Sequence, residues 1–221
     1  MVDPIPYNPL DKDNLGASVA EALLGRKVHP LGGLTRFNGA GIYAVYYTGT
    51  FPEYTPLAKR NRDGRFEAPI YVGRAIPEGG RKGGKPGETV TQALFKRMRD
   101  HENSLRATNN LAIEDFHCRF LAVDDIWIPL GESLLIAKFS PVWNVLVDGF
   151  GNHTPGKGRF EGMRPRWDVI HPGREWAEKC KPRPETPQQI LADIKTYLRT
   201  VAPPKSPHFL AEQVRAEYKD D

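Results

Sequence analysis

The sequence contains few cysteines: its 221 residues include only Cys118 and Cys180. The two lie far apart and neither belongs to a Cys-x-x-Cys pair, which excludes a disulfide framework and a structural zinc site of the usual ligand spacing. Cys118 falls in an apolar, strand-like run, so we expect it to be a small core residue. Such sparse use of cysteine indicates a reducing compartment, and we expect a cytoplasmic protein.

The chain also lacks long apolar runs. None approaches the roughly 20 residues that a membrane-spanning helix needs. The first ten residues, MVDPIPYNPL, are neither basic nor continuously apolar, unlike a secretory signal. No internal repeat is visible. We therefore expect no membrane partner and a single domain over residues 1–221, because 39% apolar residues suffice for one packed core.

A large net charge is absent as well, but the charge is unevenly distributed. The formal net charge is +4, whereas the segment from Lys59 to Arg106 holds twelve Lys or Arg and six Asp or Glu. The segment therefore carries a net +6 and the rest of the chain −2. Such a basic block is typical of proteins that bind the phosphate backbone of nucleic acids. A solvated Lys/Arg surface explains the count equally well.

The sequence has no complete nucleotide-binding loop. Residues 76–88, IPEGGRKGGKPGE, place Gly84 and Lys85 as a phosphate loop would, but Pro86 stands where a Ser or Thr must bind magnesium. No strand leads into this segment at the required distance. We therefore exclude a nucleotide cofactor and expect a flexible, basic flap.

Three apolar runs bounded by glycine or turn residues predict strands at 41–49, 69–75 and 115–123. The loop between the first two allows them to pair as a long-looped antiparallel hairpin. The expected fold is α/β (α+β), with a small three-stranded antiparallel or mixed sheet flanked by helices. Apolar periodicity and helix-start signals predict these helices at 14–25, 89–105 and 131–139, after Thr186-Pro187 and after Ser206-Pro207.

Six polar residues draw attention through their order along the chain. Taken singly, each has an ordinary structural role: a core tyrosine, a solvated helix face, an acid in the first turn of a helix, or a helix cap. Two of them, Arg97 and His101, are four residues apart and so share one helix face. The six are Tyr43, Tyr71, Arg97, His101, Glu132 and Asn144.

Together these residues resemble the GIY-YIG nuclease superfamily. Gly41-Ile42-Tyr43 supplies the first half of the family name, and Tyr71-Val72-Gly73 supplies the second, with Val in place of Ile. The resemblance implies a catalytic core over about residues 39–146. An N-terminal arm and helix, 1–38, and a C-terminal extension for DNA reading or dimerisation, 147–221, lie outside that core.

The long insertion at residues 50–68 and the two extensions make the chain similar to type II restriction endonucleases of this superfamily, in particular those that cut CCGCGG. That similarity implies a double-stranded DNA substrate, and a palindromic target calls for a homodimer. The apolar face of the helix after Thr186 either supplies the dimer interface or covers the core. That face consists of Ile190, Leu191, Ile194 and Leu198.

Two other functions stay open. One is a structure-specific or homing nuclease of the same superfamily, acting as a monomer. The other is a nucleic-acid-binding protein that keeps the fold without catalysis. The complete set of six polar residues argues against the second, because a binding protein has no need of Glu132 beside phosphates.

The resemblance also implies a role for each residue of the set. One Mg²⁺ is implied, for which Mn²⁺ is expected to substitute, and Glu132 is its expected ligand as the acidic member of the set. Arg97 suits the scissile phosphate. The general base is Tyr43, Tyr71 or His101; the resemblance favours Tyr43 as base or as orienter of the water, with His101 taking the proton on. Asn144 is expected to fix substrate or loop geometry through its amide.

Recognition of DNA is expected to rely on basic side chains in loops. Arginine paired with guanine is the commonest base-specific contact, but we expect at least half of these side chains to contact only phosphate. The candidates are Lys59, Arg60, Arg62, Arg65, Arg74, Arg81, Lys82, Lys85, Arg159, Arg164 and Arg166.

Overall fold

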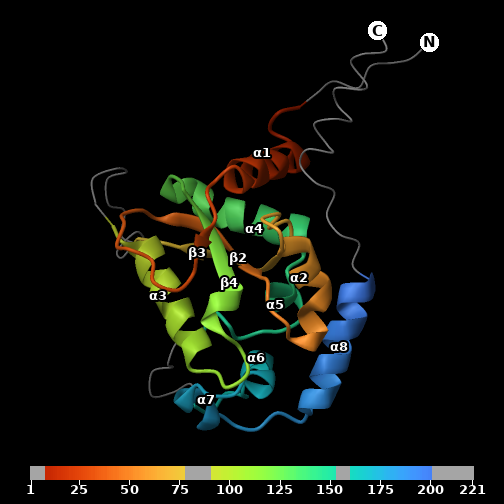
Figure 1. The fold of residues 1–221 in the computed structure, drawn as a ribbon. Coiled ribbons are helices and arrows are strands. Elements are labelled where there is room, and N and C mark those ends of the chain that lie inside the picture. The colour runs from red at the N-terminus through yellow and green to blue at the C-terminus, as the bar shows by residue number, and fades with distance from the viewer. Residues whose placement is uncertain (1–7, 78–90, 153–159, 201–221) are drawn as a thin grey trace, which may run out of the picture.

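The structure is a computed structural model that describes residues 8–77, 91–152 and 160–200 (Figure 1). Its centre is a four-stranded antiparallel sheet with the strand order β1-β4-β2-β3. The three predicted strands are all present. They are β2 (Gly41–Tyr47), β3 (Pro69–Ala75) and β4 (Phe116–Ala122).

The sheet differs from the prediction by one strand. Strand β1 (His29–Pro30) pairs with the edge of β4, His29 opposite Cys118. Two residues are too short for an alternating pattern, so the sequence alone could not reveal this strand. The predicted α/β class with a small antiparallel sheet is confirmed.

Strand β2 is the centre of the sheet. It pairs antiparallel with β3 on one side and with β4 on the other, and all seven of its residues are buried. The predicted long-looped hairpin of β2 and β3 is therefore confirmed. Because successive side chains of a strand point to opposite faces, β2 supplies the core on both sides of the sheet.

One face of the sheet is covered by helices α1 (Lys12–Leu24) and α4 (Ile128–Phe139), which contact each other. Ile42, Ala44 and Tyr46 point into this layer. Apolar residues of both helices complete the cluster there, among them Ala20, Leu23, Ile128, Leu135 and Phe139.

The opposite face carries a larger apolar cluster, into which Tyr43, Val45 and Tyr47 of β2 point. In Figure 1, helices α3 and α8 stand on opposite sides of the strands in this layer. The covering helices are α3 (Ala93–Arg106), α5 (Val142–Val145), α6 (Arg166–Ile170) and α8 (Pro187–Thr200). The site described below belongs to this layer and to the edge of β3.

The insertion between β2 and β3 is more ordered than a simple connection. It contains a 3-10 helix, η1 (Pro52–Tyr54), and helix α2 (Thr55–Asn61). Helix α2 begins with Thr55-Pro56, and proline is favoured in the first turn of a helix. The buried amide of Asn61 donates to Tyr47 O and Ala68 O, so it ties both ends of the insertion to the sheet.

Residues 160–184 contain α6 and a further short helix, α7 (Glu175–Glu178). Neither is long enough to show a periodic pattern in the sequence. The predicted helix after Ser206-Pro207 and nearly all of the predicted flap lie outside the described residues.

Helix α8 packs its apolar face against the core. Ile190 and Ile194 are fully buried, and the Tyr197 hydroxyl donates to Ser140 O at 2.8 Å. Of the two roles expected for this face, covering the core is the one that the structure supports. Within the described residues, no helix has the length and apolar character needed to cross a membrane.

Candidate active site

Each buried tyrosine of β2 has a hydrogen-bonding partner, as a buried hydroxyl requires. The Tyr47 hydroxyl accepts from Phe51 N at 2.8 Å. The Tyr46 hydroxyl accepts from Arg119 Nη1 at 3.3 Å. These two tyrosines therefore keep a structural role, while Tyr43 turns to a different set of partners.

The Tyr43 hydroxyl lies 2.6 Å from His101 Nε2 and accepts from Arg97 Nε at 3.2 Å. Both partners come from α3. Their four-residue spacing places them on one face of this helix, the face that packs on the sheet. His101 is 1% exposed and Tyr43 is fully buried. The structure thus joins the first half of the motif to the predicted Arg-x-x-x-His pair.

Tyr71 of β3 completes this group. Its ring lies 6.2 Å from that of Tyr43 and 5.4 Å from that of His101. Burial raises the pKa of the Tyr71 hydroxyl above its usual value, although Arg97 beside it acts in the opposite direction. Burial and then Tyr71 raise the pKa of Tyr43 well above its usual value, while Arg97 lowers it. Both phenols are therefore neutral at pH 7.

The two glycines of the motif permit close approaches. A Cβ on Gly41 would lie 2.1 Å from Leu121 O, so a side chain there would push β4 away. A Cβ on Gly73 would lie 2.3 Å from the Tyr43 hydroxyl, because Tyr43 and Gly73 are paired across the two strands. Gly73 therefore leaves the space in which the Tyr43 hydroxyl meets α3.

Glu132 reaches the same edge of the sheet from α4. Its carboxylate pairs with Arg74 Nε at 3.1 Å, and its side chain is 20% exposed. Burial raises the pKa of Glu132 above its usual value, while Arg74 and Arg97 lower it. Glu132 in turn contributes to the raised pKa of Tyr43 and Tyr71, so its charge acts within the site.

The Asn144 amide binds the free edge of β3. Its Oδ1 accepts from Val72 N at 2.8 Å, and its Nδ2 donates to Val72 O at 2.7 Å. A side-chain amide thereby takes the place of a neighbouring strand beside the YVG segment. The amide was expected to fix substrate or loop geometry; in the structure both of its polar atoms fix strand geometry.

Two further residues, which no sequence motif singles out, belong to this site. The Phe150 ring stacks on that of His101, with centroids 4.5 Å apart and planes at 14°. Gly151 O accepts from Arg97 Nη2 at 2.8 Å. Both follow α5 in a Gly-rich segment that has no periodicity, so only its tertiary position gives it a role.

The predicted DNA-contacting residues are spread over several elements. Arg81, Lys82, Lys85 and Arg159 lie outside the described residues. Arg62 donates to Thr48 O at 2.9 Å and Gly49 O at 2.5 Å, Arg60 pairs with Glu67 at 3.8 Å, and Arg65 pairs with Asp63 at 3.5 Å. Arg74 pairs with Glu132, as described above. Arg62 therefore joins the insertion to the end of β2, whereas the pairs of Arg60 and Arg65 are contacts within the insertion.

Arg164 and Arg166 organise the C-terminal extension. Arg164 donates to Ala177 O at 3.0 Å. Arg166 binds Glu185 at 2.6 Å and Asp193 at 2.5 Å, which joins α6 to α8. Their guanidinium groups are occupied by these contacts, so a role in DNA binding has to compete with them.

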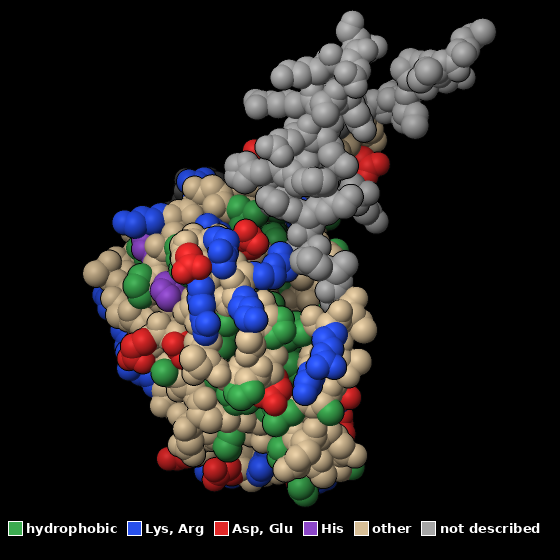
Figure 2. All heavy atoms as spheres, turned by 45° about the vertical axis from the view of Figure 1, so that its right-hand side comes forward, with side chains coloured by type: hydrophobic (Ala, Val, Ile, Leu, Met, Phe, Trp, Pro, Cys, Tyr) green, Lys and Arg blue, Asp and Glu red, His purple; other side chains and the backbone are tan. Residues whose placement is uncertain are grey.

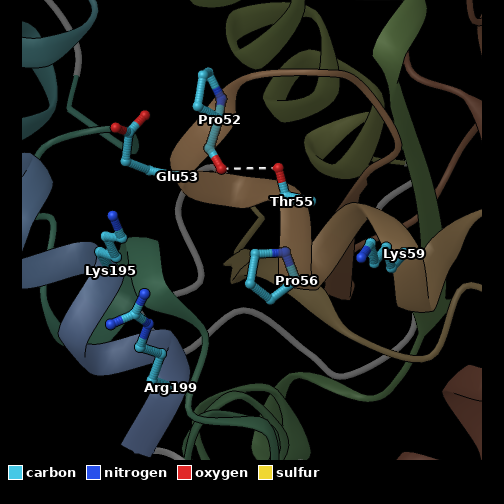
Figure 3. A pocket seen from close by; sticks show the side chains of 7 residues that line it. All are labelled: Pro52, Glu53, Thr55, Pro56, Lys59, Lys195 and Arg199. Carbon is cyan, nitrogen blue, oxygen red and sulfur yellow. Dashed lines mark hydrogen bonds between the residues drawn. The ribbon is translucent and has the colours of Figure 1, made fainter.

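Lys59 differs from these arginines because it lines a surface pocket of about 350 Å³ (Figure 3). The pocket lies between the η1–α2 segment and α8, whose Lys195 and Arg199 form its other wall. Glu53 is its one acidic lining residue. On the molecular face of Figure 2, Lys and Arg side chains gather across the middle with a few Asp and Glu between them.

The described residues contain no group of three or more His, Cys, Asp or Glu side chains arranged to hold a metal ion. Within the described part of the chain, Glu132 is the acidic side chain at this edge of the sheet, paired with Arg74. This donor set does not fit a zinc ion, which takes several Cys or His ligands. It fits Mg²⁺, which is commonly held by one or two carboxylates, waters and substrate phosphate.

The GIY and YVG strands, the Arg97–His101 pair on α3 and Glu132 at the same sheet edge define a nuclease of the GIY-YIG class. The chain belongs to the family described as the Eco29kI GIY-YIG domain, which matches residues 35–198. The resemblance drawn from the motifs is therefore confirmed, and the protein is a restriction-type endonuclease that acts on DNA. Among curated proteins a search found no match.

The family match runs well beyond the expected core of residues 39–146. It includes α6, α7 and most of α8, and also the segment that supplies Phe150 and Gly151. The C-terminal extension is thus part of the family's domain up to residue 198.

Proposed function

We propose that this protein is a type II restriction endonuclease that hydrolyses double-stranded DNA site-specifically with one divalent metal ion, Mg²⁺ or Mn²⁺. The single observation that carries the proposal is the Tyr43 hydroxyl, placed between His101 Nε2 and Arg97 Nε. This is a proton-transfer pair beside a fixed positive charge, at an edge where Glu132 is partly exposed.

A tyrosine that is neutral at pH 7 cannot remove a proton from water unless it gives up its own. Arg97 can only donate to the Tyr43 oxygen. The Tyr43 proton is therefore available to His101 Nε2, 2.6 Å away. We propose that the phenol oxygen takes the proton of the attacking water while its own proton passes to His101.

Arg97 suits the second task of the site, which is to neutralise charge that develops on the scissile phosphate. Its Nε and Nη2 are directed to Tyr43 and Gly151, which fixes the plane of the guanidinium group. A preorganised cation of this kind needs no reorganisation during the reaction. Tyr71, beside the same guanidinium, would help to place the water.

Glu132 is the residue that would hold the metal ion. A bound divalent cation supplies charge stabilisation for the phosphate and the leaving oxygen. Glu132 must be ionised for that purpose, and the positive charges of Arg74 and Arg97 favour the ionised form. The ion pair with Arg74 has to open or share its oxygens when a cation binds.

The DNA surface is proposed to include the basic pocket formed by Lys59, Lys195 and Arg199. All three side chains are exposed, and one acid, Glu53, opposes them. Such a pocket favours a DNA phosphate over a base edge because lysine carries no sequence information as a point charge. Removing these cations should weaken binding of all sequences alike and reduce its salt dependence.

A palindrome such as CCGCGG remains the proposed target, and a homodimer the proposed form, because two-fold protein symmetry matches two-fold DNA symmetry. The apolar face of α8 is buried within one chain, so the proposed interface uses other surface. The two buried free cysteines, Cys118 and Cys180, suit action in a reducing cytoplasm.

Digestion of plasmid DNA with Mg²⁺ or Mn²⁺, followed by mapping of the ends, tests this function. Discrete fragments with symmetric ends, lost on addition of EDTA, are expected. Cleavage confined to branched DNA would support a structure-specific nuclease instead. Binding without any cleavage in either metal would overturn the catalytic proposal, and sedimentation of the protein with a cognate duplex would decide the oligomeric state.

A further inference from the structure

Arg174 is a buried arginine outside the six motif residues, in the C-terminal extension. It is 5% exposed. Its Nε and Nη2 donate to the two carboxylate oxygens of Asp168, both at 2.6 Å. Its guanidinium lies 4.5 Å from the ring centre of Trp167 and 4.7 Å from that of Trp176. The two hydrogen bonds and the two ring contacts together fix the orientation of the guanidinium group.

The remaining N–H groups of the Arg174 guanidinium bind the loop of residues 149–152. Nη2 donates to Gly149 O at 2.9 Å. Nη1 donates to Asn152 O at 3.1 Å and, more weakly, to Phe150 O at 3.4 Å. Three of the four carbonyl groups in this loop therefore bind one side chain. The fourth, that of Gly151, accepts from Arg97 Nη2 in the active site.

The same loop touches the proposed proton acceptor. The Phe150 ring stacks on His101 and lies edge-on to Tyr71, with centroids 5.0 Å apart. Gly151 has no room for a side chain: a Cβ there would lie 2.5 Å from the Tyr71 hydroxyl and 3.0 Å from Arg97 Nη2. A shift of this loop would therefore be transmitted directly to Arg97 and to the His101 ring.

We propose that Arg174 is a positioning residue for the reaction: it fixes the loop 149–152 and, through Gly151 O and the Phe150 ring, the orientations of Arg97 and His101. Its importance for catalysis rests on the proposed function. The role needs arginine because a planar fork with five donors can bind a carboxylate and several carbonyls at once. Lysine keeps the charge but not the fork.

The first test is Arg174→Lys in the full-length protein. Since misplacement of a reacting group by about 1 Å can cost on the order of 100-fold in rate, the single-turnover cleavage rate is expected to fall by about 10- to 100-fold. Because Arg174 is buried and does not face solvent, the variant's affinity for a cognate duplex should stay close to that of the wild type.

Arg119→Lys is the matched control. Arg119 also donates to two backbone carbonyls, Arg26 O and Phe66 O, and lies 5.3 Å from a ring centre, that of Tyr46. It lies on the opposite face of the sheet, so the same chemical change there should leave the cleavage rate near that of the wild type.

A second readout does not need activity. Because His101 stacks on Phe150, the aromatic ring current should shift the His101 ring protons upfield in NMR spectra. Arg174→Lys should move these signals toward ordinary values, whereas Arg119→Lys should not. Should Arg174→Lys fail to fold, Asp168→Asn loosens the fork from its other side without touching the active site.

A wild-type rate in folded Arg174→Lys, an equal loss in Arg119→Lys, or unchanged His101 signals would each overturn the positioning role. Failure of the wild type to cleave DNA would instead overturn the proposed function, and the NMR comparison would still decide whether Arg174 sets the His101 ring. The two failures are therefore distinguishable.

Discussion

The hydroxyl of Tyr43 lies 2.6 Å from Nε2 of His101, and both side chains are almost fully buried in the core. The contact joins the central strand β2 to α3. Burial raises the pKa of Tyr43 well above its usual value, and Tyr71 raises it further. This arrangement supports the proposed transfer of the Tyr43 proton to His101.

Replacing Tyr43 by Phe should test this role with little change in packing. The loss of one hydroxyl is expected to lower the cleavage rate by at least about 100-fold, the scale of a lost acid–base group. Single-turnover cleavage at saturating protein measures the effect. Tyr46→Phe removes a hydroxyl from the same strand on the other face and should leave the rate nearly unchanged. A near-normal rate for Tyr43→Phe would show that the Tyr43 hydroxyl has only a structural role.

Glu132→Gln should abolish metal-dependent cleavage because it removes the one carboxylate proposed to hold the cation, while the size of the side chain is kept. DNA binding should stay measurable in a gel-shift assay. Glu161→Gln is the control: Glu161 is an exposed acid paired with Lys181 at 2.7 Å, remote in sequence from the motif. Retained cleavage by Glu132→Gln at any Mg²⁺ concentration would remove Glu132 from the metal site.

Arg74→Gln should shift the acid limb of the pH–rate profile to higher pH. Burial already raises the pKa of Glu132, and Arg74 lowers it by favouring the ionised carboxylate. Without Arg74 the protonated form is favoured, so activity should be lost at a higher pH as the solution is acidified. The profile is measured at constant excess Mg²⁺.

Lys138→Gln removes one positive charge from the same helix as Glu132, near its other end. It should leave the acid limb in place. A limb that moves to lower pH in Arg74→Gln would mean that Glu132 does not set it.

Asn144→Asp should destabilise the edge of β3. The change keeps the shape but removes the donor to Val72 O and sets a carboxylate against that carbonyl. An unsatisfied or repelled polar group at a partly buried site costs about 1–3 kcal/mol. Urea denaturation measures the loss, and Asn103→Asp at an exposed position of α3 controls for the added charge. Equal stability of the two variants would contradict a clamp on Val72.

The buried His171 predicts a dependence of stability on pH. It lies against Tyr54 at 2.8 Å and Asn110 at 3.0 Å, and burial lowers its pKa to about 3. The unfolded chain binds a proton near the usual value of 6.5 whereas the folded protein does not, so stability is full above pH 6.5 and is lost as the pH falls toward 3. One such proton corresponds to about 1.4 kcal/mol per pH unit.

Denaturant unfolding of the wild type and of His171→Gln at several pH values between 4 and 7 isolates this contribution, because glutamine does not titrate. The variant should show the smaller slope, whatever its absolute stability. His29→Gln, at a partly exposed position, should keep the wild-type slope. Identical slopes for wild type and His171→Gln would show that His171 is not held neutral.

Three of the four strands and the four longest helices of the described residues, α1, α3, α4 and α8, followed from the sequence because their signals are local. Glycine-bounded apolar runs fixed β2, β3 and β4 to within two residues at each end. Helix α2 carried a start signal at Thr55-Pro56 but was hidden by its basic residues. Strand β1 and helices α6 and α7 are too short for any period to emerge, and only contacts with the rest of the chain keep them ordered.

The sequence by itself determined the class of the protein, since the order of Tyr43, Tyr71, Arg97, His101 and Glu132 was enough to predict a GIY-YIG nuclease. It gave no role to Phe150, Gly151 or Arg174, and for Asn144 it predicted a role in substrate or loop geometry without indicating Val72 as the partner. Their partners lie up to about a third of the chain away, and hydrogen bonds between such distant segments leave no local pattern. Only the tertiary structure decided that Asn144 completes the edge of β3 and that Arg174 organises the loop behind Arg97 and His101.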